Sequence, residues 1–183
     1  MTADKDDILR FWFEEATPDQ WFQKNPDFDN EIRNRFEEDY VCAARGEYDH
    51  WMETAKGSLA LIIMLDQFPR NMYRDTASMF STDDKALSVA RHAIAKNFDH
   101  MLNSNERAFM YLPFEHSESM EDQKESLNLF AQLKDDNPVY YDFAVKHFKV
   151  IEKYGRFPHR NAILNRHSTQ SEEEYLVNSN SGF

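Results

Sequence analysis

The sequence predicts one all-α domain over residues 1–183, with about eight helices packed antiparallel to their neighbours. Apolar residues recur every three or four positions through most of the chain, which is the spacing of one helix face. Only four glycines and six prolines interrupt 183 residues, and no Asn-Gly or Asp-Gly hairpin turn occurs. At this length a chain buries enough apolar surface to form a core by itself.

The first three expected helices lie before Gly46. One begins behind the acidic residues Asp4, Asp6 and Asp7 and carries apolar side chains at 8, 9, 12 and 13. Thr17 and Gln20 form a capping-box pattern that predicts a short second helix. A stripe at every fourth position predicts a long third helix that ends near Gly46. The stripe comprises Phe28, Ile32, Phe36, Tyr40 and Ala44.

The segment Ala55–Phe68 is apolar on nearly every side. A helix of that kind is usually the buried centre of its domain. We expect Pro69 to end it, because the residue before a proline avoids the α region.

The second half of the chain contains five further expected helices. Residues 81–84 open one with Leu87, Ala90, Ile94 and Phe98 facing inward, and residues 103–106 open another that runs to Pro113. A stripe at 120, 127, 130 and 133 predicts the next, and Asn137-Pro138 begins a helix that Gly155 closes. Thr169 with Glu172 caps a last short helix, and residues 178–183 are expected to fray.

Composition and charge exclude several classes of protein. The 33 acidic and 21 basic residues give a net charge of −12, which repels phosphate backbones, so we expect no nucleic-acid partner. The longest clean apolar run, Leu59–Leu65, is too short to span a membrane, and residues 1–7 lack the pattern of a secretory signal. The single Cys42 cannot form an internal disulfide, so we expect a cytoplasmic protein. The sequence leaves a homodimer open.

Recognised motifs of catalysis are absent. The chain has no glycine-rich phosphate loop, nucleophile elbow, CxxC pair or HExxH motif, so we predict no cofactor and no tight metal site. A metal site assembled from distant residues, for example Glu115, His116 and His159, stays open.

Three polar clusters interrupt the apolar pattern, and the first follows the most apolar helix. It contains four candidate ligand-binding residues, Asp66, Gln67, Arg70 and Asn71. A carboxylate in the last turn of a buried helix meets the negative end of the helix dipole, so Asp66 needs a cationic or donor partner. Arg70 is that partner in a structural reading, and in a functional reading the cluster is the wall of a pocket.

The second cluster spans residues 111–118, where Pro113 is expected to break a helix rich in aromatic residues. The acidic residues that follow lie at the start of the next expected helix, where the positive end of the helix dipole favours them. Glu115 and His116 stand at the break itself, and a histidine beside a carboxylate is a candidate pair for general acid–base catalysis.

The third cluster supplies the other four candidate ligand-binding residues, Arg156, His159, Arg160 and Asn161. Arginine commonly binds carboxylate or phosphate through two parallel hydrogen bonds. These arginines either neutralise Asp66 and Glu115 or form an anion-binding wall. In both readings we expect the three clusters to converge, because helix ends collect at the rims of a helical layer. His147, on the apolar stripe of its helix, is expected to be a hydrogen-bonded core histidine.

The same residues resemble those of the bacterial Domain of Unknown Function 924 family. The matching motifs are Phe11-Trp12-Phe13, Trp21-Phe22, Leu65 to Asn71, Tyr111 to Glu118 with Gln123, and Gly155 to Asn161. The resemblance covers residues 8–176 and implies a helical fold similar to the tetratricopeptide-repeat superfamily. It implies no established activity, cofactor or catalytic residue. The family usually has a glycine after the arginine that closes the first cluster, where this chain has Arg74-Asp75.

Three functions fit these observations. The first is a binding module whose clusters line a pocket for a small anionic molecule or a peptide. The second is an enzyme in which Glu115 and His116 supply acid–base chemistry, Asp66 orients them, and Arg70 or Arg160 holds an anion. The third is a buried polar network that fixes the order of the helices without a ligand.

Overall fold

The computed structural model describes residues 3–178, and all regular secondary structure in that range is helical. The predicted all-α class is therefore confirmed. The chain divides into two compact units, which are described separately: unit 1 comprises the residues up to Arg74 together with Ser78–Pro113, and unit 2 comprises Asp75–Ala77 and the residues from Phe114 onward. The single-domain expectation stays a prediction, and the predicted frayed tail lies outside the described residues except for Asn178.

The helices of unit 1 have the following bounds: α1 Lys5–Arg10, a π-helical turn Phe11–Glu15, α2 Pro18–Phe22, α3 Pro26–Arg45, α4 Ala55–Ile62, a π-helical turn Ile63–Gln67, α5 Phe68–Met72, α6 Asp83–Ala95 and α7 Ser104–His116. The last three residues of α7 belong to unit 2. Unit 2 also contains α8 Met120–Ala131, α9 Pro138–Tyr154 and α10 Gln170–Asn178. Short 3₁₀ turns lie at Asp49–Glu53, Ala77–Phe80, Asp99–Met101 and Pro158–Arg160.

The predicted capping residues begin their helices as expected. The backbone N–H of Thr17 donates to Gln20 Oε1 at 2.8 Å, and that of Thr169 donates to Glu172 Oε2 at 2.7 Å. Asn137 Oδ1 accepts from a backbone N–H in the first turn of α9 at 3.2 Å. Each of these bonds satisfies an N–H that the helix itself leaves without an acceptor.

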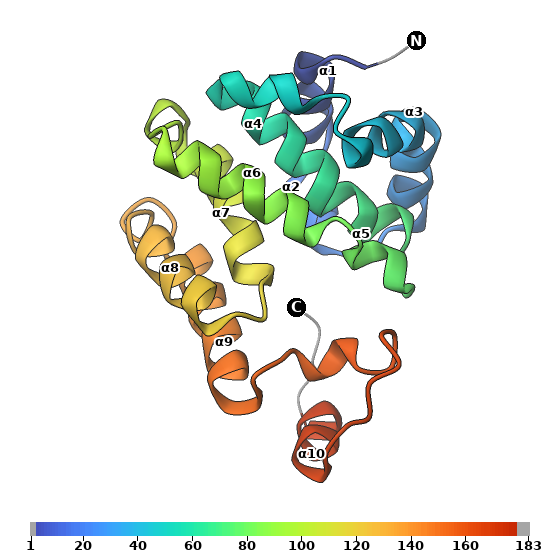
Figure 1. The fold of residues 1–183 in the computed structure, drawn as a ribbon, viewed down its shortest axis with the longest axis vertical. Coiled ribbons are helices and arrows are strands. Elements are labelled where there is room, and N and C mark those ends of the chain that lie inside the picture. The colour runs from blue at the N-terminus through green and yellow to red at the C-terminus, as the bar shows by residue number, and fades with distance from the viewer. Residues whose placement is uncertain (1–2, 179–183) are drawn as a thin grey trace. The chain divides into compact units, whose positions relative to one another are not determined.

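Helix α4 is the centre of unit 1 and is flanked by α1 and α6 (Figure 1). Every side chain from Leu59 to Leu65 is fully buried, which confirms the prediction for this segment. Gly57 lets the 3₁₀ turn Asp49–Glu53 lie directly on α4, because a Cβ at position 57 would stand 2.1 Å from the carbonyl oxygen of Trp51.

The expectation that Pro69 ends the buried helix is wrong, because the chain widens into a π-helical turn and continues as α5. Proline lacks the N–H that would normally bond to the carbonyl of Leu65. The hydroxyl of Thr82 takes its place and donates to that carbonyl at 2.6 Å. Pro113 likewise lies inside α7, which continues to His116, so the predicted break there is also wrong.

The buried face of α6 differs from the predicted one. The buried face of α6 comprises Ala86, Val89, Ala90 and Ala93, whereas Leu87, Ile94 and Phe98 are half-buried. The small alanines allow α6 to pack closely on α4. On α9, Phe143 is 40% exposed while Ala144, His147, Val150 and Ile151 are buried.

Unit 2 is built on a hairpin of α8 and α9, which pack against each other. The short connection between them makes the two helices antiparallel. Val150, Ile151 and Phe157 form a buried apolar cluster at the end of α9, with Met120, Tyr154 and Tyr175 packed against it. The first half of α8 turns polar residues inward instead, because Asp122, Gln123 and Ser126 are buried.

Asp75 follows Arg74 with a φ of 64°, which is the left-handed region that favours glycine. Aspartate is among the few other residues that tolerate this region. The observed backbone thus fits the glycine that the resemblance implies for this position. Separately, the helices within residues 3–178 include none whose length and apolarity would let it cross a bilayer.

Candidate functional site

The first polar cluster is a charge network inside unit 1. Asp66 is fully buried, and one of its carboxylate oxygens lies 3.2 Å from Arg70 Nη1 while the other accepts from Gln67 Nε2 at 2.6 Å. Arg70 also binds both carboxylate oxygens of Asp83, at 2.8 and 2.9 Å. The sequence-based pairing of Asp66 with Arg70 is therefore confirmed, and Asp83 is the member that the sequence analysis missed.

The same network extends to the end of α5. Asn71 donates to the carbonyl of Gln67 at 3.1 Å and accepts from Arg74 at the same distance. Arg74 in turn pairs with Asp29 of α3 at 2.8 and 2.9 Å. These contacts fasten α5 to α3, which favours a structural role for the first cluster.

Two members of the third cluster bind other parts of unit 2. Arg156 holds Glu172 of α10 at 2.6 and 2.8 Å and lowers the pKa of Glu172 to about 2. Asn161 donates to Ser168 and accepts from Arg166, at 3.1 and 2.9 Å. Both side chains therefore fix the segment that leads into α10. For this reason they are not part of the ligand-binding set that we propose below.

The remaining predicted residues gather at the end of α7 in unit 2. Glu115 is buried, and its Oε1 lies 3.2 Å from Nδ1 of the buried His147 on α9. The same Nδ1 lies 2.9 Å from the carbonyl oxygen of Phe143. A backbone carbonyl can only accept, so Nδ1 carries the proton of the neutral ring and Nε2 carries the lone pair. His147 is thus the hydrogen-bonded core histidine that the sequence predicts.

Phe157 is the apolar centre of this group. The rings of His147 and His159 each lie with their centroids 5.6 Å from the ring of Phe157. The guanidinium of Arg160 stands 4.6 Å from the same ring and donates to the carbonyl of His116 at 2.9 Å. We call Glu115, His116, His147, His159 and Arg160 the histidine cluster.

Burial and like charge keep two of these imidazoles neutral at pH 7. Burial is the main cause that lowers the pKa of His147 to about 3 and that of His159 to about 4. The positive charge of Arg160 adds to both effects, whereas Glu118 opposes the shift at His159. The hydrogen bond to the carbonyl of Phe143 opposes the shift in the pKa of His147, but the cost of burying charge prevails.

Gln123 and Ser126 lie on the inward face of α8. The amide nitrogen of Gln123 donates to the carbonyls of Glu115 and Ser117 at 2.7 and 2.8 Å, so it satisfies acceptors at the end of α7. Its Oε1 and the hydroxyl of Ser126 are buried and have no hydrogen-bond partner among residues 3–178. Buried polar atoms without partners are uncommon in native proteins, and here they mark a place where a further donor would be stabilised.

Sequence reasoning missed two residues and one pairing at this site, and a single signal could have found the two residues. Gln123 and Ser126 occupy core positions of the α8 stripe, three residues apart, where polar side chains are unexpected. The pairing of His147 with Glu115 had no such signal, since the two are distant in sequence. No group of three His, Cys, Asp or Glu side chains in the described part of the chain is arranged to hold a metal ion.

The convergence of the first cluster with the other two stays a prediction. Asp66, Gln67, Arg70 and Asn71 belong to unit 1, and the other predicted site residues belong to unit 2.

Comparison with known proteins gives two matches and no function. Residues 8–180 match the family described as "Bacterial protein of unknown function (DUF924)". A solved structure of a protein of unknown function from Agrobacterium tumefaciens is 42% identical, with a TM-score of 0.90, and the match covers 96% of this chain and 97% of that one. A comparison with curated proteins gives no match. The chain therefore belongs to the bacterial protein family of unknown function DUF924.

Proposed function

We propose that unit 2 is a binding module for a small anionic molecule, held by His116, His159 and Arg160. The observation that carries the proposal is the gathering of one guanidinium and two imidazoles around Phe157, with the ring of His116 beside that of His147, in a chain with a net charge of −12. Arginine binds carboxylate or phosphate through strong charge-assisted hydrogen bonds, and an imidazole near it can donate a further hydrogen bond to the same anion.

The electrostatics of the histidine cluster favour an anion. Arg160 lowers the pKa of both His147 and His159, which means that its charge creates a positive potential at both rings. An anion entering this potential would be attracted and would also make protonation of the rings easier. Buried acceptors of Gln123 and Ser126 add a place for a hydroxyl or amine of the same ligand.

The exposure of the cluster suits a partly enclosed site. His116 and His159 are half-buried, whereas His147, Glu115 and Arg160 are buried. The two half-buried rings would therefore meet the ligand beside the guanidinium of Arg160, whose positive charge would attract it. A cytoplasmic place of action remains part of the proposal, because the lone Cys42 suits a reducing compartment.

Titration with inorganic phosphate and with citrate, followed by NMR of the imidazole groups, tests the proposal. We expect saturable shifts of the His116 and His159 signals, and His159→Gln or Arg160→Gln should each weaken binding about tenfold. Comparing the two anions distinguishes a phosphate site from a carboxylate site.

Two matched variants serve as controls. His167→Gln changes an exposed histidine, and Arg156→Gln changes an arginine of the same turn whose contacts go to Glu172. Neither should alter the anion affinity. Absence of saturable shifts with both anions, or equal losses in the control variants, would refute the proposal.

Acid–base catalysis is a second candidate, favoured by the contact of 3.2 Å between Glu115 and His147. A carboxylate that orients an imidazole is a common arrangement of a general base. However, a pKa of about 3 makes His147 a weak base at neutral pH, since effective bases have pKa values near the working pH. We therefore rank binding first. Turnover in a broad substrate panel that disappears in His116→Gln and persists in His167→Gln would reverse this order.

A further inference from the structure

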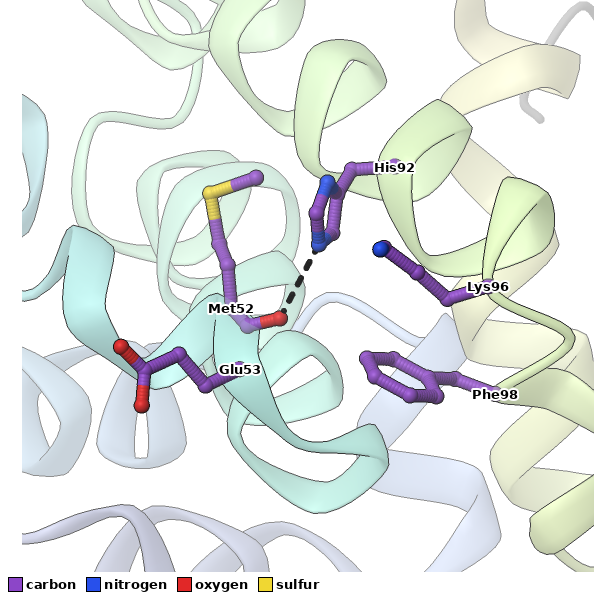
Figure 2. Close-up of a pocket in the computed structure, with 5 residues that line it drawn as sticks. All are labelled: Met52, Glu53, His92, Lys96 and Phe98. Carbon is purple, nitrogen blue, oxygen red and sulfur yellow. Dashed lines mark hydrogen bonds between the residues drawn. The ribbon is translucent and has the colours of Figure 1, made fainter.

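Unit 1 contains a pocket of about 350 Å³ that none of the predicted site residues lines. Its walls are Met52 and Glu53 from the 3₁₀ turn, His92 from α6, and Lys96 and Phe98 from the chain just beyond α6 (Figure 2). The volume lies at the small end of the range for sites that bind small molecules. The pocket involves unit 1 alone and is independent of the histidine cluster.

Hydrogen bonds and close packing within unit 1 fix the walls of the pocket, so a ligand could bind without a rearrangement of the chain. The carbonyl of Met52 accepts from His92 Nε2 at 3.2 Å and from the hydroxyl of Ser58 at 3.4 Å. Gly57 allows the 3₁₀ turn to sit against α4 at a distance that no larger residue permits. A pre-formed wall of this kind reduces the entropy that a ligand must overcome on binding.

The positive charge in the pocket lies on one side. The side chain of Lys96 is exposed and forms no hydrogen bond or ion pair with another described residue, whereas those of Lys56 and Lys85 are paired with Glu106 and Asp49. Figure 2 shows the ammonium of Lys96 near His92, while the carboxylate of Glu53 points away from it on the far side of Met52. The ring of Phe98 and the side chain of Met52 supply apolar surface beside this positive charge.

We propose that this pocket binds a small aromatic carboxylate. Lys96 would hold the carboxylate, and Phe98 and Met52 would contact the ring, because phenyl rings and thioethers both pack favourably against aromatic groups. Lys96 is also the C-cap residue of α6, where a cation complements the helix dipole. That role explains a positive charge at this position but not the apolar pocket beside it.

Indole-3-acetate and its neutral amide are suitable probes, because they differ in charge and hardly in shape. In ¹H–¹⁵N NMR titrations we expect the acid to bind with a Kd on the order of 1 mM, as its size and an open pocket imply. The shifted amides should be confined to residues 49–58 and 92–98. The neutral amide should bind at least about fivefold more weakly, since it lacks the ion pair.

The variants Lys96→Gln and Lys124→Gln separate the proposed contact from a general effect of charge. Lys124 is exposed on α8, so its replacement removes the same charge elsewhere. Lys96→Gln should abolish the preference for the acid over the amide, and Lys124→Gln should preserve it. Phe98→Leu should weaken both probes because the aromatic contact is lost.

Three results would overturn the proposal: no saturable shift at about ten times the expected Kd, equal binding of acid and amide to the unmodified protein, or an undiminished preference in Lys96→Gln. A thermal unfolding scan of Lys96→Gln shows whether the pocket remains folded. If that variant is unfolded, the comparison of acid with amide in the unmodified protein still decides the question.

Discussion

Replacing Arg70 by methionine is expected to destabilise unit 1 by about 3–5 kcal/mol, because it leaves buried carboxylates without their cation. Asp66 is fully buried, and the side chain of Asp83 is 19% exposed. Methionine preserves most of the apolar stem, so the loss reports on charge rather than on packing. A second contact of Asp66, with Gln67, involves a neutral amide and compensates only partly.

Urea unfolding followed by tryptophan fluorescence measures this effect, since all three tryptophans lie in unit 1. With a slope of about 2 kcal/mol per molar urea, the midpoint should fall by roughly 1.5–2.5 M. The exposed pair of Arg10 with Asp7 supplies the control, because both side chains are more than a third exposed. Arg10→Met should therefore leave the urea midpoint nearly unchanged.

A second substitution tests the cause of the loss of stability in Arg70→Met. Asp66→Asn combined with Arg70→Met removes both charges and should recover a large part of the stability, since the uncompensated charge is then gone. A loss under about 1 kcal/mol in Arg70→Met, or no recovery in the double variant, would refute the assignment of this cluster as a buried charge network.

Three other substitutions probe features described above. Thr82→Val removes the donor to the carbonyl of Leu65 and should cost about 1–3 kcal/mol in urea unfolding, whereas Thr82→Ser should cost less. Gly57→Ala forces a Cβ to 2.1 Å from the carbonyl oxygen of Trp51, so its melting temperature should fall sharply; an unchanged value would contradict the close packing of the 3₁₀ turn. The pKa of His147 is lowered from 6.5 to about 3, so the unfolded chain binds more protons between these values and stability should fall as pH falls from about 6.5 toward 3. Unfolding at pH 4.5 and 7 should show a smaller pH dependence in His147→Gln.

The fold was predictable where its signals are local in sequence. Thr17, Asn137 and Thr169 mark helix starts because each forms a hydrogen bond with a residue two or three positions later. The pairing of Asp66 with Arg70 was predictable for the same reason, since residues four apart share a helix face. Such contacts need no knowledge of the rest of the chain.

The wrong predictions involve partners that are distant in sequence. Pro69 does not end its helix because the hydroxyl of Thr82 binds the carbonyl that proline leaves without a donor. The predicted buried face of α6 was wrong in part because the prediction favoured large apolar residues. Close packing on α4 instead selects alanines. The contact of Glu115 with His147 joins α7 to α9, and no local pattern encodes it.

Proton uptake on anion binding tests the proposed function of unit 2 most directly. If citrate or phosphate enters the histidine cluster, it raises the lowered pKa of His159 and so draws protons from the solution. Calorimetric titration at pH 5.5 in two buffers that differ in ionisation enthalpy measures this uptake. The proposal predicts measurable uptake in the unmodified protein that falls in His159→Gln and persists in His167→Gln. Absence of binding, or binding with the same proton uptake in His159→Gln, would contradict it.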